Sequence, residues 1–146
     1  MKKLIILRGC PGSGKSTFAD FIFDTIGNGM SCCKYSADDF FIDKKTGKYK
    51  FDSNLLHKAH SQCRQYVKTS MELDYDNNLI IVDNTNTTKK EIQPYLDLAK
   101  AHDYEVTILT VGSYDTLSVN KYIKRNIHGV PPDKVRDMAH RIKENL

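Results

Sequence analysis

Long apolar runs are absent from this sequence of 146 residues. No stretch reaches the roughly eighteen apolar residues of a membrane span, and Leu4–Leu7 is too short for the hydrophobic region of a signal peptide. A strong charge excess is absent too, because 22 Lys and Arg residues face 18 Asp and Glu residues. A membrane protein, a secreted scaffold and a DNA-coating protein are therefore not expected, whereas an anionic ligand fits the net charge of +4.

Cysteine is scarce, and its spacing is not that of a metal site. None of the four cysteines belongs to a Cys-x-x-Cys pair, so the sequence does not support a structural zinc site. Cys32 and Cys33 are adjacent, which suits neither a metal pair nor an easy disulfide. Cys10 has no identifiable base beside it and is not expected to be a nucleophile. We expect small apolar side chains in a reducing cytosol, and hence a cytoplasmic protein.

The sequence does contain an alternation of short apolar runs and helical patterns. Strands are expected near residues 4–7, 31–35, 78–82 and 104–111, and helices beginning near residues 15, 55, 88, 115 and 132. This alternation predicts a parallel sheet with helices on both faces, and the length suits one domain over residues 1–146. A polar loop or hairpin is expected about residues 43–51. Ligands in such folds bind outside the carboxyl ends of the strands, so residues that follow the strands are the candidates.

The segment Gly9–Thr17 matches the pattern GxxxxGK[ST], follows an apolar strand and opens a helical pattern. Glycines let backbone N–H groups close around a triphosphate, and the helix N-terminus adds partial positive charge. We expect Lys15 to reach the β- and γ-phosphates and the hydroxyl of Ser16 to ligate Mg²⁺. The expected cofactors are ATP and Mg²⁺, and the expected nucleotide-binding residues are Gly12, Ser13, Gly14, Lys15, Ser16 and Thr17.

Two adjacent carboxylates, Asp38 and Asp39, follow the strand expected at residues 31–35. A carboxylate there can orient an attacking hydroxyl and accept its proton during phosphoryl transfer. Asp38 could instead cap a short helix, and the residues alone leave these two interpretations about even. Phe40 and Phe41 either stack on a base or pack in the core, and we expect core packing.

A third carboxylate, Asp83, ends the strand expected at residues 78–82. This is the usual place of a carboxylate that organises Mg²⁺ in such folds, and we expect Asp83 to hold Lys15, Ser16 or a metal-bound water. The polar residues behind it are Asn84, Thr85 and Asn86. They either hydrogen-bond a substrate or form a turn that caps the next helix.

Positive charge gathers in the last two helical patterns, which are joined by the turn at Asn126–Pro131. A cation on a movable helical hairpin can close over the phosphates and neutralise charge as the γ-phosphoryl group departs. We therefore expect a lid over about residues 115–146, with Arg125 as its catalytic cation. A solvated helix face accounts for most of the remaining charges.

The combined motifs resemble the kinase domain of T-even phage polynucleotide kinase and, more closely, kinase domains of the NEDD-four-binding-protein type. The shared positions are Gly9–Thr17, Asp38-Asp39, Tyr49 and Phe51, Ala59-His60, Asp83–Asn86, Pro94-Tyr95 with Ala99, Arg125-Asn126 and His128–Pro131. This resemblance covers essentially the whole chain. It implies an α/β P-loop NTPase of adenylate-kinase type, with a parallel sheet of four to five strands flanked by helices and a C-terminal helical lid.

The resemblance also implies a kinase that moves the γ-phosphate of ATP to a hydroxyl, in some members the 5′-OH of DNA or RNA. Asp38 matches the family's general base, Arg125 its lid arginine and Thr85 a substrate-contacting position. Two departures bear on the acceptor. Phe41 stands where the phage enzyme has an arginine for the substrate phosphate, and the lid loop is shorter. The 3′-phosphatase domain of the phage enzyme is expected to be absent.

Three functions follow as hypotheses. The first is an ATP- and Mg²⁺-dependent kinase of a nucleic acid 5′ end, active in repair, with the catalytic residues Lys15, Asp38 and Arg125. Its expected substrate-binding residues are Asp38, Asp39, Asn84, Thr85 and Asn86. The second hypothesis is a kinase of a nucleoside, nucleotide, sugar or modified base. The third is a non-enzymatic ATP-binding module that gates a partner.

Overall fold

The sheet has four strands, all parallel, in the computed structural model, which describes residues 1–26, 29–73 and 75–146. The strands are β1 (Lys2–Arg8), β2 (Ser31–Tyr35), β3 (Asn78–Asp83) and β4 (Glu105–Thr110). Their order is β2-β3-β1-β4, so β1 and β3 are central. The central position explains why every residue of β3 is buried, since helices cover both faces of such a strand.

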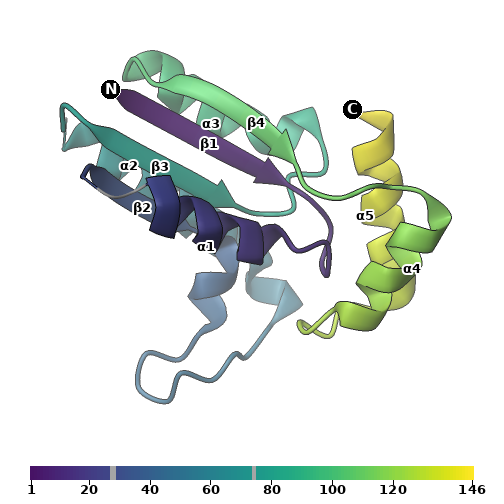
Figure 1. Ribbon diagram of the computed structural model, residues 1–146. Coiled ribbons are helices and arrows are strands. Elements are labelled where there is room, and N and C mark those ends of the chain that lie inside the picture. The colour runs from purple at the N-terminus through teal and green to yellow at the C-terminus, as the bar shows by residue number, and fades with distance from the viewer. Residues whose placement is uncertain (27–28, 74) are drawn as a thin grey trace.

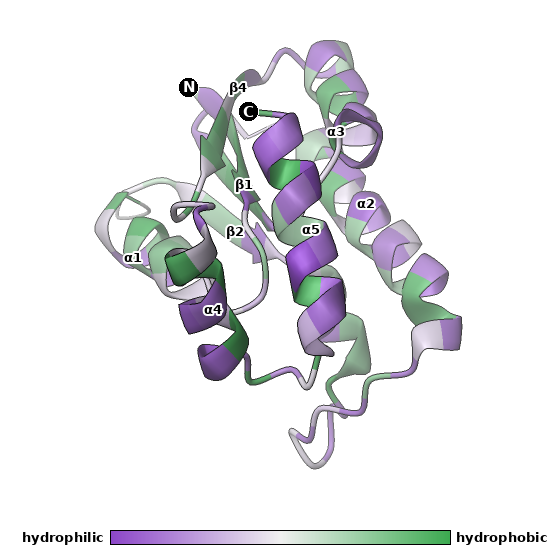
Figure 2. Cartoon of the chain, turned by 90° about the vertical axis from the view of Figure 1, so that its right-hand side faces the viewer, coloured by the Kyte–Doolittle hydropathy of each residue, from purple (hydrophilic) through white to green (hydrophobic). Residues whose placement is uncertain are grey.

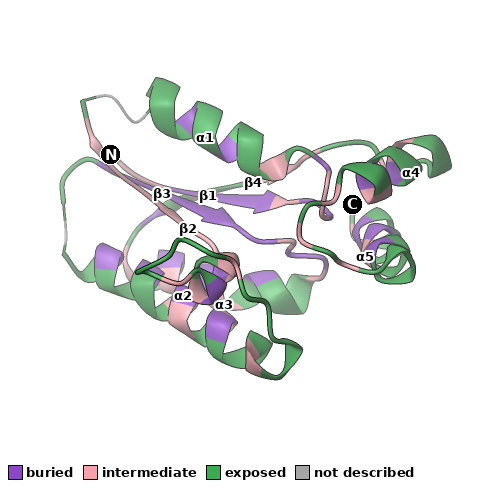
Figure 3. Cartoon of the chain, turned by 90° about the horizontal axis from the view of Figure 1, so that it is seen from below, coloured by how far each residue is buried: buried purple, intermediate pink, exposed green. Residues whose placement is uncertain are grey.

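Five helices surround the sheet in the described part of the chain (Figure 1). They are α1 (Lys15–Ile26), α2 (Leu56–Glu72), α3 (Lys89–Ala101), α4 (Thr116–Arg125) and α5 (Pro132–Glu144). Helix α1 covers one face, α2 and α3 cover the other, and α4 and α5 lie beyond the arrowheads of the strands (Figures 1 and 3). The expected architecture, a parallel sheet of four to five strands flanked by helices, is confirmed with four strands.

Successive side chains of a strand point to opposite faces of the sheet, so the core has two layers. Leu4 and Ile6 of β1 point to the layer that contains α2 and α3, whereas Ile5 and Leu7 point to the layer under α1. A third cluster joins α4 to α5 and includes Cys10 from the loop after β1. The lid helices therefore pack against the phosphate loop through their own small core.

The surface of α5 that faces away from this core is mainly hydrophilic, as Figure 2 shows. Its buried side chains are Val135, Ala139 and Ile142, which lie on one face of the helix. Across the described residues, no helix combines the length and the apolar character that crossing a bilayer demands.

The polar segment expected at residues 43–51 is a projecting loop (Figure 1). A single antiparallel bridge joins Ile42 to Tyr49, and the Asp43 side chain accepts hydrogen bonds from the backbone of Lys45 and Thr46. The loop returns to the body through a short turn of 3-10 helix at Ser53–Leu55, just before α2. It therefore begins and ends near the carboxyl edge of the sheet.

Candidate active site

The loops that follow β1 and β3 meet at the carboxyl edge of the sheet. The Gly9 N–H donates to the Thr85 carbonyl at 3.1 Å, which joins the phosphate loop to the segment behind Asp83. Helix α1 starts with the bond from the Phe18 N–H to the Gly14 carbonyl at 3.0 Å. The earlier N–H groups of a helix have no acceptor within it. They provide the donors that a phosphate group needs.

Two glycines shape this loop for different reasons. Gly12 and Gly14 both have positive φ, +84° and +90°. A Cβ on Gly14 would meet nothing within 4 Å, whereas a Cβ on Gly12 would lie 2.1 Å from the Tyr122 carbonyl oxygen. Gly14 thus borders open space, and Gly12 lets α4 approach the loop.

Lys15 and Asp83 form an ion pair at the centre of the site. Lys15 Nζ lies 2.6 Å from Asp83 Oδ1, and the two side chains are only 11% and 5% exposed. The pairing was one of the contacts expected for Asp83. It holds the lysine ammonium at the strand end, beside the first turn of α1 that carries the exposed Ser16 and Thr17.

The first acidic loop lies at the end of β2, in a turn of 3-10 helix at Ala37–Phe41. The cap of this turn is Ser36, whose side chain accepts from the Asp38 N–H. The alternative that Asp38 caps a short helix is therefore wrong, because the serine hydroxyl already fills that position. Phe41 is buried, as expected, and Phe40 packs edge-on against it at 5.2 Å between ring centroids.

Two side chains from elsewhere in the chain contact the Asp38 carboxylate. The Tyr49 hydroxyl donates to Asp38 Oδ1 at 3.2 Å, and His128 Nε2 lies 3.9 Å from Asp38 Oδ2. The Tyr49 and His128 rings are themselves in edge contact, with centroids 5.2 Å apart. The projecting loop and the turn of the lid thus meet at this carboxylate.

Electrostatics keep Tyr49 in its donor form and perturb Asp39. Burial, followed by the charge of Asp38, raises the pKa of Tyr49 to about 12. Partial burial raises the pKa of Asp39, and the charges of Asp38 and Asp83 add to the rise while Lys34 opposes it. Burial and like charges therefore both disfavour the ionised form of Asp39.

Asn84 and Asn86 are buried and are used within the protein. Asn84 Oδ1 accepts from the Ala37 N–H at 2.8 Å, which ties the end of β3 to the turn that carries Asp38. Asn86 has φ +48° and donates to the Leu7 carbonyl at 2.8 Å. These contacts make both residues positioning groups, and their expected contact with substrate stays a prediction, as it does for the partly exposed Thr85.

Arg125 lies at the last residue of α4 and is exposed. Its guanidinium is 5.5 Å from the centroid of the Tyr122 ring, and among the described residues no contact joins it to Lys15 or Asp38. The Tyr122 hydroxyl donates to the Ser113 carbonyl at 2.9 Å. Arg125 thus sits on a helix that is firmly attached to the phosphate loop, and its role as lid cation stays a prediction.

Cys10 is unsuited to nucleophilic work, as expected. It is fully buried within the lid cluster, and burial raises the pKa of its thiol to about 11. Since a thiolate is the reactive species, Cys10 serves as a small apolar side chain between the loop and the lid.

The residues fit a nucleoside triphosphate and its magnesium ion. The unpaired N–H groups of the first turn of α1, the Lys15 ammonium and the open space beside Gly14 suit phosphates. The Ser16 hydroxyl and the Asp83 carboxylate are oxygen donors of the kind that Mg²⁺ prefers, and they would hold the ion.

Sequence reasoning missed the partners of Asp38. Tyr49 was noted only as a position shared with relatives, and His128 only as part of a lid turn. No local pattern places either beside Asp38, because they lie 11 and 90 residues away along the chain. Their contacts arise from the fold alone.

A phosphate loop at the carboxyl edge of a parallel sheet, with paired acidic loops and a helical lid, defines the class of P-loop kinase-like domains. A family model described as an AAA domain (AAA_33) matches residues 4–144. The chain belongs to this family, in agreement with the resemblance to polynucleotide-kinase and NEDD-four-binding-protein-type kinase domains.

Curated relatives agree with this assignment. Human NEDD4-binding protein 2 is 34% identical over 135 residues, which are 92% of this chain and 7% of that protein. The rat 2′,3′-cyclic-nucleotide 3′-phosphodiesterase is 26% identical over 108 residues, 74% of this chain and 23% of that protein. The chain thus spans only a small part of either relative.

Solved structures show the same fold. A chain of the Pnkp1/Rnl/Hen1 RNA repair complex superposes with a TM-score of 0.71 at 21% identity and covers 98% of this chain and 44% of that chain. The APS kinase CysC of Mycobacterium tuberculosis gives a TM-score of 0.56 at 13% identity. That match covers 98% of this chain and 95% of the CysC chain. At these identities the likeness establishes the kinase-like fold and leaves the acceptor open.

Proposed function

We propose that this chain is an ATP- and Mg²⁺-dependent phosphotransferase that phosphorylates the 5′-hydroxyl of a DNA or RNA end. The observation that carries the proposal is the Asp38 carboxylate, which is held by Tyr49 at the same edge of the sheet as the Lys15–Asp83 pair. The phosphate donor and a proton acceptor are thereby given separate places in one site. Relatives include a chain of an RNA repair complex, which favours a nucleic acid acceptor and a role in repair.

The chain's own residues account for each part of the transfer. Asp38 accepts the proton of the attacking hydroxyl while the new O–P bond forms and the bond from the γ-phosphorus to the bridging oxygen breaks. Lys15 and the first N–H groups of α1 stabilise charge on the phosphate oxygens. Arg125 adds a further positive charge when the lid closes. Ser16 and Asp83 would hold a magnesium ion, which would supply further positive charge against the phosphate oxygens.

We also place this activity in a reducing cytosol. All four cysteines are free thiols, two of them buried. Oxidation is not needed to complete the fold, which suits an intracellular compartment.

Transfer of labelled γ-phosphate from ATP tests the proposal. The acceptors are 5′-hydroxyl DNA and RNA oligomers, the same oligomers already carrying a 5′-phosphate, and free nucleosides. We expect label on the 5′-hydroxyl oligomers and none on their phosphorylated counterparts. Label on nucleosides alone would assign a small-molecule kinase, and tight ATP binding without transfer to any acceptor would assign a binding module.

Asp38→Asn is the decisive variant, with Asp137→Asn on an exposed part of α5 as its matched control. We expect Asp38→Asn to lower kcat by about 10²–10⁴-fold, because a positioned base contributes that much to proton transfer. The fold and ATP affinity should be unchanged. Full activity in folded Asp38→Asn would exclude Asp38 as the base.

A further inference from the structure

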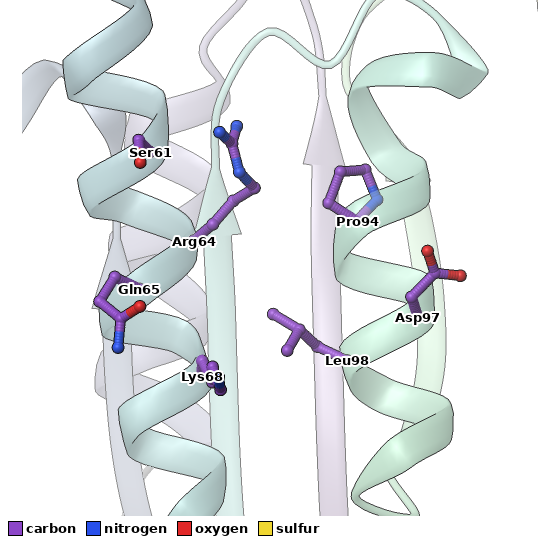
Figure 4. A pocket seen from close by; sticks show the side chains of 7 residues that line it. All are labelled: Ser61, Arg64, Gln65, Lys68, Pro94, Asp97 and Leu98. Carbon is purple, nitrogen blue, oxygen red and sulfur yellow. The ribbon is translucent and has the colours of Figure 1, made fainter.

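A groove of about 440 Å³ runs between α2 and α3, on the side of the sheet opposite α1. Ser61, Arg64, Gln65 and Lys68 of α2 line one wall, and Pro94 and Asp97 of α3 line the other (Figure 4). The groove lies outside the phosphate loop and its acidic loops. It therefore needs its own explanation.

Arg64 differs from the other charged residues of this groove in its contacts. Lys68 Nζ lies 3.9 Å from Glu72 Oε1, and Asp97 Oδ1 accepts from Gln93 Nε2 at 2.8 Å. Across residues 1–26, 29–73 and 75–146, Arg64 makes no hydrogen bond or ion pair. It is also partly buried, so its charge is less well solvated than that of a surface lysine.

The groove leads toward the acceptor side of the site. In Figure 4 the Arg64 guanidinium points along the groove to the end where the strand arrows terminate. One turn earlier on α2, burial lowers the pKa of His60. The charges of Glu91 and Asp38 raise this pKa, and that of Arg64 lowers it. His60 is thus within electrostatic reach of both Arg64 and Asp38.

A second connection runs through the residue before Arg64. The Cys63 sulfur accepts from Asn84 Nδ2 at 3.6 Å, and Asn84 in turn holds the backbone of Ala37, next to Asp38. The wall of the groove and the turn carrying the proposed base are therefore parts of one packed unit.

The charge of the groove lining favours an anion. The charged residues that line the groove are Arg64 and Lys68, against the single carboxylate of Asp97. The planar fork of an arginine matches phosphate oxygens. Because Ser61, Gln65 and Lys68 are exposed along the groove, the shape suits a chain lying in it better than an enclosed small molecule.

We propose that this groove carries the acceptor strand, a single-stranded polynucleotide whose 5′ end lies at Asp38 and whose backbone continues between α2 and α3 with a phosphate on Arg64. The proposal rests on the proposed function. It narrows the substrate from any 5′-hydroxyl to that of a chain several nucleotides long.

Direct binding without ATP tests the groove separately from catalysis. The probe is a 5′-hydroxyl single strand with a 3′-fluorescein label, about ten nucleotides long, a length within the range of known single-strand sites. Fluorescence anisotropy over a series of KCl concentrations compares wild type, Arg64→Ala, Arg64→Lys and the exposed-residue control Lys100→Ala.

We expect Arg64→Ala to weaken binding about tenfold, as the loss of one charge-assisted contact does. The slope of log K against log salt should become shallower by about 0.7, the value for one released counterion on a single strand. Arg64→Lys should keep the slope and bind with intermediate affinity, and Lys100→Ala should bind like wild type. Arg64→Ala behaving like Lys100→Ala would overturn the proposal, as would equally strong competition by an acidic peptide.

Acceptor kinetics separate this proposal from the proposed function. We expect Arg64→Ala to raise KM about tenfold for the single strand with kcat unchanged, and to leave the KM for a nucleoside 3′-monophosphate unaltered. Equal effects on both acceptors would refute the groove and leave the kinase intact. If wild type phosphorylates no 5′-hydroxyl, the proposed function fails, and the anisotropy series still decides the groove. Should Arg64→Ala not fold, Arg64→Lys and Lys68→Ala carry the same comparison.

Discussion

Lys15 has a partner before any nucleotide arrives. Its ammonium lies 2.6 Å from Asp83 Oδ1, and both side chains are close to fully buried. Such a pair pre-positions the lysine, but it also makes each partner depend on the other. Removing one leaves an uncompensated charge in a poorly solvated place.

Because Lys15 and Asp83 depend on each other, removing either one should destabilise the fold. We expect Lys15→Met alone to lower the free energy of unfolding by about 3 kcal/mol, because the Asp83 carboxylate is left buried without a partner. Adding Asp83→Asn should restore part of the loss. Urea unfolding of wild type, both single variants and the double variant measures the coupling. Strictly additive losses would mean that the two groups do not interact.

Tyr49 offers a second prediction at the residue scale. Its hydroxyl donates to Asp38 Oδ1, so we expect Tyr49→Phe to lower kcat about tenfold through a misplaced base, in line with a hydrogen bond to a charged group. The KM for ATP should not change. Steady-state kinetics beside Tyr75→Phe, an exposed tyrosine, provide the comparison. An unaltered kcat would show that Asp38 needs no support from the projecting loop.

The helices α4 and α5 pack closely on the phosphate loop. The Tyr122 backbone of α4 approaches Gly12 so closely that no Cβ fits, and Cys10 belongs to the same cluster as α5. Further bonds hold α5 to the body, from Arg141 Nε to Thr87 Oγ1 at 3.1 Å and from Arg8 Nη1 to the Asn145 carbonyl at 3.2 Å. The positions of α4 and α5 are therefore coupled to that of the loop at Gly9–Thr17.

Two glycines with similar positive φ values differ in what a Cβ atom at each would contact. Gly129 in the lid turn has φ +68° and open space around it, whereas Gly12 has φ +84° and the Tyr122 carbonyl beside it. We expect Gly129→Ala to cost about 1–2 kcal/mol, the penalty of the left-handed conformation. Gly12→Ala should cost about 3–5 kcal/mol, because overpacking adds to that penalty.

Urea denaturation of the two alanine variants measures the difference. Nucleotide affinity is the second readout, since displacement of α4 should weaken it in Gly12→Ala and spare it in Gly129→Ala. Equal losses of stability in both variants would show that α4 can shift away from the new Cβ atom at no cost in unfolding free energy.

Across the whole molecule, four segments meet at one edge of the sheet. They are the loops after β1, β2 and β3 and the turn between α4 and α5. A ligand that contacts several of them binds only the folded chain and so stabilises it. We expect ATP with Mg²⁺ at about a hundred times its Kd to add roughly 2.7 kcal/mol to the unfolding free energy. A thermal melt with a non-hydrolysable ATP analogue measures this gain.

Two controls show where the gain originates. Chelation of Mg²⁺ with EDTA should reduce it, and Lys15→Met should abolish it, since the phosphates lose their main cation. A gain that persists in Lys15→Met would place the nucleotide elsewhere on the chain.

The order of the elements and the phosphate loop could be predicted from the sequence. These features depend on local chemistry: apolar periodicity sets strands and helices, and glycines followed by Lys15 and Ser16 at a helix start suit phosphate whatever surrounds them. The position of Asp83 at a strand end was equally local. Its pairing with Lys15, one of three contacts expected for it, also required β1 and β3 to be neighbours in the sheet.

The contacts of the acidic loops, by contrast, depend on how the helices and strands pack. Ser36 rather than Asp38 caps the 3-10 turn. The Asn84 side chain hydrogen-bonds the Ala37 backbone and the Cys63 sulfur. Tyr49 and His128 reach Asp38 from distant segments, and the Arg64 groove exists only because α2 lies beside α3. Contacts between residues far apart in the chain depend on how whole elements pack, and no local pattern encodes them.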